Sequence, residues 1–79
     1  MKIPSIKKLV DACNIQQLQA AEEAILEGLS PEIEVEGDDE GEQLTHIMAA
    51  LFIREEMEKG ADYLTALRTY SGRVRSSIS

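Results

Sequence analysis

Cysteine and histidine, which many metal and catalytic sites require, each occur only once in this sequence. They are Cys13 and His46. A small oxidised scaffold needs paired cysteines, so the chain has no internal disulfide framework. A zinc site needs three or four protein ligands, and one cysteine with one distant histidine in a single chain does not supply them.

Basic residues and long apolar runs are also scarce. Eight Lys and Arg stand against fifteen Asp and Glu, a formal net charge of −7. Because nonspecific nucleic-acid binding depends on basic side chains that neutralise phosphates, we expect no nucleic-acid partner. The longest apolar run is far shorter than the roughly 20 residues that span a bilayer, and the first residues lack the apolar stretch of a secretory signal. We therefore expect no membrane association and a cytoplasmic location.

The chain also lacks the common motifs of enzymes. It has no glycine-rich phosphate loop, no Gly-x-Ser-x-Gly and no His-Glu-x-x-His. Its 79 residues fit one domain. A chain of this size buries only about 60% of the surface that its unfolded form exposes, so we expect marginal stability. We predict a protein that is not an enzyme and needs no cofactor.

Apolar residues at steps of three and four predict two helices before residue 30. The first apolar stripe begins at Ile3 and continues to Cys13. Asn14 is placed to cap the second helix, with Gln17 at the capping-box position three residues later. Gly28 stands where a left-handed residue would end this helix.

The segment 30–41 departs from the helical pattern. Residues 32–36 alternate acidic and apolar side chains with the period of two that a half-buried strand shows. One strand alone cannot satisfy its backbone groups. The segment therefore either lies extended over a groove between helices or pairs with the same segment of a second chain. We prefer the extended loop, because pairing about a two-fold axis would bring like charges together.

Two further helices follow this loop. Asp39 can cap the third helix, which ends near Gly60, and Asp62 can cap the fourth. The last turn, at residues 76–79, is expected to fray because serines weaken it. The third helix carries the richest apolar stripe of the chain, formed by Leu44, Ile47, Met48, Leu51 and Phe52.

These elements predict an all-α fold. We expect one domain over residues 1–79, a compact bundle of three to four amphipathic helices with an acidic extended loop at 30–41 between the second and third. The stripes supply roughly twenty apolar side chains, near the lower limit for an independent domain. Pairing would relieve that limit, so we expect a homo-oligomer or a complex with another protein.

The acidic run is open to more than one interpretation. Seven carboxylates lie within residues 32–42, and calcium takes roughly six to eight oxygen ligands. The run does not match an EF-hand loop, because registers that start at Glu34 or Glu36 place no carboxylate at the last ligand position. A solvated charge run that also caps the next helix accounts for the same residues. A dense acidic surface can also dock onto a basic partner.

The single histidine and the single cysteine both receive a structural interpretation. Glu42 stands four residues before His46 on the same helical face, and such a pair is usually a surface contact rather than a catalytic one. Cys13 continues the first apolar stripe and is interpreted as a small buried hydrophobe. Lys7 and Lys8 leave open the alternative of a redox-sensing thiol.

Three stretches carry a resemblance to a known family. They are Ile-Pro-Ser-Ile-Lys-Lys-Leu-Val at 3–10, Glu-Val-Glu-Gly-Asp-Asp-Glu-Gly-Glu-Gln-Leu-Thr-His at 34–46 and Tyr-Ser-Gly-Arg-Val-Arg-Ser-Ser-Ile-Ser at 70–79. Over nearly its whole length the chain resembles a small uncharacterised bacterial family, a domain of unknown function. The resemblance implies a cytoplasmic bacterial protein and assigns no activity, cofactor or site.

Together these observations favour a non-catalytic interaction module that self-associates or binds another protein. The alternative is a small-ligand or divalent-cation binding protein that uses the acidic segment 32–42; added calcium or magnesium would then raise its melting temperature. The possible interaction surface comprises acidic residues of the loop and apolar residues of the third helix: Glu34, Glu36, Asp38, Asp39, Glu40, Leu51 and Phe52.

Overall fold

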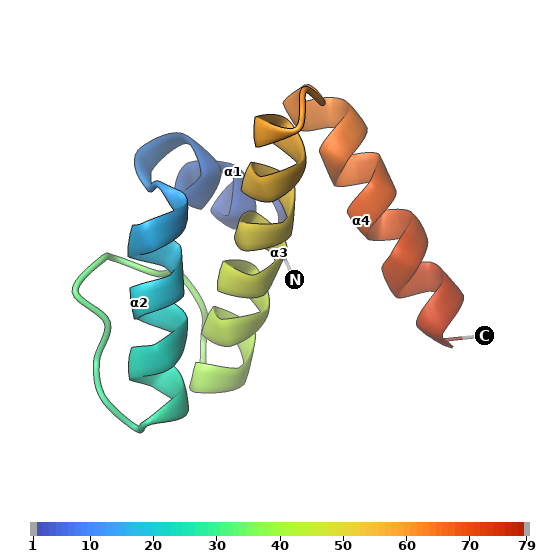
Figure 1. Cartoon of the computed structure of the whole chain (residues 1–79). Helices are drawn as coiled ribbons and strands as arrows, with labels where there is room; N and C mark the ends of the chain where they lie inside the picture. The colour runs from blue at the N-terminus through green and yellow to red at the C-terminus, as the bar shows by residue number, and fades with distance from the viewer. Residues whose placement is uncertain (1, 79) are drawn as a thin grey trace.

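The computed structural model describes residues 2–78, and it describes side chains as far as Arg73. The chain forms four helices, α1 (Ile3–Ala12), α2 (Ile15–Leu26), α3 (Glu40–Glu58) and α4 (Tyr63–Ile78), and no strand occurs within residues 2–78 (Figure 1). The predicted all-α fold is confirmed. None of these helices combines the length and the apolarity needed to cross a membrane, over the residues described.

The boundaries of α2 lie where the sequence predicts them. The Gln17 backbone N–H donates to Asn14 Oδ1 at 2.8 Å, and the Asn14 N–H donates to Gln17 Oε1 at 2.9 Å. This reciprocal pair is the predicted capping box. Past the other end, Gly28 adopts a positive φ of 79°, as predicted for a residue that terminates a helix.

The caps of α3 and α4 are confirmed as well. Asp39 Oδ1 accepts the Glu42 backbone N–H at 2.7 Å, and Asp62 Oδ1 accepts the Thr65 backbone N–H at 2.8 Å. The backbone of α4 continues to Ile78. The prediction that residues 76–79 fray falls on side chains and on a last residue that the structure does not describe, so it stays a prediction.

Helix α3 is the centre of the fold, because α1, α2 and α4 each pack against it (Figure 1). A helix covered from several directions buries side chains all round rather than along one stripe. The small Ala49 and Ala50 are fully buried, and they allow neighbouring helices to approach α3 closely. Met48, a member of the predicted stripe, is consequently 49% exposed. The buried apolar side chains are Ile6, Leu9, Val10, Cys13, Leu18, Ala21, Ile25, Ile47, Ala49, Ala50, Leu51, Ile53 and Ala66.

Residues 27–39 form an extended connection between α2 and α3. Ile33 and Val35 pack against the core, while the acidic residues that alternate with them are exposed. The predicted extended loop is therefore confirmed, with its period of two. Its end is earlier than the predicted residue 41, because Glu40 and Gly41 already form the first turn of α3. Figure 1 shows the loop rising along α2 before it descends to the start of α3.

Candidate functional site

A groove with a volume of about 260 Å³ lies between α2 and α3. We call it the α2–α3 groove. Leu51 is only 7% exposed, whereas Met48 is 49% exposed and Phe52 is half-buried. The exposed apolar surface of the groove therefore comes from Met48 and Phe52 more than from Leu51. The groove is lined by Gln19, Glu22, Met48, Leu51, Phe52 and Glu55.

Phe52 connects this groove to α4. Its ring lies 5.6 Å from the ring of Tyr70, centroid to centroid, with 51° between the planes. The guanidinium carbon of Arg73 lies 5.0 Å from the centre of the Phe52 ring, a cation–π arrangement. Of the α4 side chains that the structure describes, only Ala66 is buried. The apolar surface of the groove therefore continues, only partly covered, onto α4.

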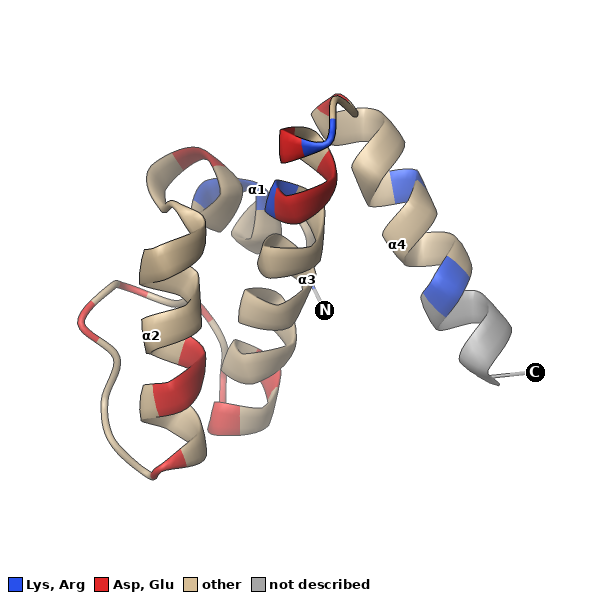
Figure 2. Cartoon of the chain, viewed as in Figure 1, with Lys and Arg blue, Asp and Glu red and all other residues tan. Residues whose placement is uncertain are grey.

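The charges on the two sides of α3 have opposite signs. Helix α2 contains Glu22 and Glu23 and no basic residue, and Glu22 lines the groove together with Glu55. Residues 63–73 of α4 contain two arginines and no acidic residue. Figure 2 shows red segments on α2 and blue segments on α4, with α3 between them. Of the two arginines, Arg73 lies over the Phe52 ring beside the groove, so the groove has acidic side chains on its α2 side and one basic side chain on its α4 side.

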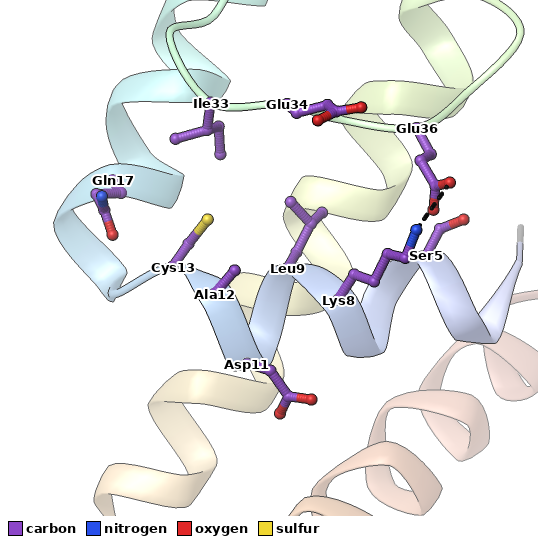
Figure 3. Close-up of a pocket in the computed structure, with 10 residues that line it drawn as sticks. All are labelled: Ser5, Lys8, Leu9, Asp11, Ala12, Cys13, Gln17, Ile33, Glu34 and Glu36. Carbon is purple, nitrogen blue, oxygen red and sulfur yellow. Dashed lines mark hydrogen bonds and ion pairs between the residues drawn. The ribbon is translucent and has the colours of Figure 1, made fainter.

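A second cavity, of about 560 Å³, separates α1 from the loop; we call it the loop cavity (Figure 3). Leu9, Cys13 and Ile33 contribute its apolar surface. At one end Lys8 Nζ lies 3.4 Å from Glu36 Oε2, an ion pair between two largely exposed side chains. Such a pair contributes little stability by itself, but it marks where the loop meets α1.

Hydrogen bonds from Ser5 and Lys8 lower the pKa of the Glu36 carboxyl, in that order of importance. A carboxyl whose pKa is lower in the folded chain stabilises the fold above its ordinary pKa of about 4.3. That stabilisation is lost as the pH falls through the lower folded value. We therefore expect Glu36→Gln to destabilise the protein at pH 7, with a difference from the wild type that shrinks in acid. Urea unfolding at a series of pH values measures this, and a difference that stays constant down to pH 3 would contradict it.

The acidic residues proposed from the sequence do not converge on one point. Glu34 lines the loop cavity, Glu36 pairs with Lys8, and Asp39 caps α3. Asp38 and Glu40 are exposed. Over the described residues, no three His, Cys, Asp or Glu side chains are placed to hold a metal ion together. The geometry therefore gives a divalent-cation site no support.

Cys13 is a free thiol at the floor of the loop cavity and is 8% exposed. The predicted small buried hydrophobe is confirmed. Burial raises the pKa of the thiol, and the positive charge of Arg54 opposes this more weakly. Since the thiolate is the reactive form, both the burial and the raised pKa slow its chemistry.

We expect a disulfide reagent such as DTNB to modify Cys13 at least about tenfold more slowly in the native protein than in urea-unfolded protein at the same pH. The release of the coloured thiolate measures both rates. Free glutathione at the same pH is the reference for an unhindered thiol. A native rate close to that of glutathione would instead favour the redox-sensing interpretation.

The predicted surface pair between Glu42 and His46 is wrong, because the His46 side chain is fully buried. Its Nδ1 lies 2.7 Å from the Glu36 carbonyl oxygen, and its Nε2 accepts the Lys2 backbone N–H at 3.0 Å. A carbonyl can only accept, so Nδ1 carries the ring proton. Glu42 Oε1 stands 4.0 Å from Nε2 and is buried without a hydrogen-bond partner. The ring therefore ties together α3, the loop and the start of α1, and both of its nitrogens are occupied.

The sequence interpretation missed the exposure of Met48 and the position of Arg73 over Phe52. A signal for the first was present, since adjacent alanines at 49 and 50 indicate close helix packing on their own side of α3. That packing leaves Met48 on a different side. No local pattern marks Arg73, because its contact with Phe52 depends on the angle at which α4 leaves α3.

Fold and surfaces together define a small all-α protein with a central helix, a partly open groove and a loop held by a buried histidine. The chain belongs to a family of unknown function, DUF6952, whose family model matches residues 1–79. The resemblance found in the sequence is thus confirmed as membership of a family without an assigned activity. No curated protein and no solved structure matches the chain.

Proposed function

We propose that this protein is a non-catalytic interaction module that docks through the face containing the α2–α3 groove. The observation that supports this is the partly open apolar surface of Met48, Phe52 and Tyr70. Met48 is 49% exposed, and Phe52 and Tyr70 are only half-buried. Methionine, aromatic residues and arginine are enriched in protein interfaces relative to other surfaces. Arg73, over the Phe52 ring, adds the polar rim typical of such sites.

The chemistry available in the chain agrees with a role in binding. The one histidine is fully buried, and both of its ring nitrogens form hydrogen bonds with the backbone, so neither is accessible to a substrate. The one cysteine is buried with a raised pKa. A cytoplasmic setting, in which a free thiol persists, fits the unpaired Cys13.

Site-specific photo-crosslinking in the source cells tests the docking surface. A photoreactive amino acid at position 48 is expected to give discrete crosslinked species, with this chain itself or with another protein. The matched control is position 32, an exposed residue of the loop that does not line the groove. Crosslinks from 32 but not from 48 would move the site to the acidic loop. No crosslink from either position would count against an interaction module.

The loop cavity supports a second candidate function, small-ligand binding. Its volume of about 560 Å³ lies within the usual range of about 300–1,000 Å³ for ligand pockets. It combines apolar side chains with the carboxylates of Glu34 and Glu36. A thermal-shift screen of amine-bearing small molecules, with calcium and magnesium included, tests it. A ligand that raises Tm of the wild type but not of the Glu34→Gln variant would favour this function.

A further inference from the structure

We propose that the partner of the docking face is a second copy of this chain, related by a two-fold axis that runs along α3 between the two copies. This inference rests on the proposed function, since it names the partner of the same face. The observation that supports it is an apolar centre on α3, with the acidic Glu22 and Glu55 on the α2 side and the basic Arg73 on the α4 side.

The charge arrangement selects the direction of the axis. In a symmetric dimer both copies use the same surface. The part of that surface on one side of the axis therefore contacts the part from the opposite side in the second copy. With the axis parallel to α3, the α2 side of one copy lies against the α4 side of the other. Glu22 and Glu55 then face Arg73 of the second copy, and Arg73 faces their counterparts. An axis perpendicular to α3 would place acid against acid, which is unfavourable.

The same axis brings the apolar centres together. Residues close to a two-fold axis meet their own counterparts, so Met48 and Phe52 of the two copies would cover each other. Methionine adapts its shape to such contacts because it is flexible and polarisable. Burial of this surface in a dimer would increase the buried surface of a chain of only 79 residues. This matters because small domains alone bury a low fraction of their surface.

Analytical ultracentrifugation of the wild type is the first test. We expect a dimer in the micromolar range that weakens as salt is added, because opposite charges contribute to it. A chain that sediments as a monomer up to about 1 mM has no useful affinity for itself, and that result would overturn the inference. This measurement needs no variant, so loss of folding cannot obscure it.

Charge reversal tests the geometry. The pair Glu22→Lys with Glu55→Lys, and separately Arg73→Glu, should each raise the dimer Kd at least about tenfold. An equimolar mixture of the two variants should restore a dimer, because each now complements the other. Arg68→Glu is the matched control: Arg68 stands two residues before Tyr70, on another side of α4, and its reversal should leave the dimer in place. Failure of the mixture to associate would overturn the proposed axis.

A disulfide test locates the centre of the interface. In a Cys13→Ser background, Met48→Cys should form a covalent dimer under mild oxidation, whereas Glu32→Cys should not. A covalent dimer from Glu32→Cys alone would instead indicate pairing of the loops. If the chain is monomeric and position 48 still crosslinks to another protein, the inference that the partner is a second copy is overturned, whereas the proposed function stands. A monomeric chain without any crosslink would overturn both.

Discussion

His46→Phe is expected to lower the free energy of unfolding by about 3 kcal/mol, because it leaves two backbone groups without their partner. Phenylalanine fills a similar space but bonds neither the Glu36 carbonyl oxygen nor the Lys2 N–H. A buried polar group that loses its partner costs about 1–3 kcal/mol, and both of these bonds are partly buried. For a chain of this size the whole stability is about 4–12 kcal/mol, so this one substitution removes a large share of it.

Urea unfolding followed by circular dichroism measures this loss. Gln16→Ala, at an exposed position of α2, is the control and should change stability by less than about 0.5 kcal/mol. Hydrogen exchange adds a local readout, since the Lys2 amide should lose protection in His46→Phe even under native conditions. If the variant were as stable as the wild type and equally protected, His46 would not hold the loop and the N-terminus to α3.

The helices could be predicted from the sequence because their signals are local. A capping residue and its partner lie three residues apart, as at Asn14 and Gln17 or at Asp39 and Glu42. The regular spacing of apolar residues can likewise be recognised within a single helix. The loop segment was predicted for the same reason, since the alternation of Ile33 and Val35 with acids shows which side chains face the core.

The position of His46 could not be predicted in this way. Its two hydrogen-bond partners lie 44 and 10 residues away in the chain. Whether they reach the ring depends on how α1 and the loop lie against α3, which no local pattern specifies. The Glu42 carboxylate, one turn before His46, supported a surface pair in the sequence, but the His46 ring is fully buried, with Glu42 Oε1 4.0 Å from its Nε2.

The candidate surface was predicted in part. Phe52 was selected from the apolar stripe of α3 and does lie at the edge of the groove, whereas its neighbour Leu51 is 7% exposed. The stripe alone cannot tell which of its members the other helices cover. That depends on three helices packing around α3 from different directions, and Met48, a member of the same stripe, is half exposed.

Gly37→Ala is expected to lower the free energy of unfolding by at least about 2 kcal/mol, because a side chain at this position would strain the backbone and collide with a neighbouring residue. Its φ is +155°, a conformation that residues with a side chain rarely adopt. A Cβ there would lie 2.7 Å from Gln43 Cγ and 2.9 Å from the Gln43 backbone nitrogen. The side-chain carbon can move away, but the nitrogen belongs to the first turns of α3, so the loop itself must shift.

Gly28→Ala is the matched control, since Gly28 has φ of +79° but nothing within 4 Å of an added Cβ. It measures the cost of a left-handed conformation where an added Cβ meets no close neighbour, about 1 kcal/mol. Gly37→Ala should exceed it in urea unfolding, and it should also speed the reaction of Cys13 with DTNB, because the displaced loop covers that thiol. Adding Gln43→Ala should recover only part of the loss, since the backbone nitrogen at 2.9 Å remains. Full recovery, or equal costs for the two glycines, would show that α3 does not limit where the loop can lie.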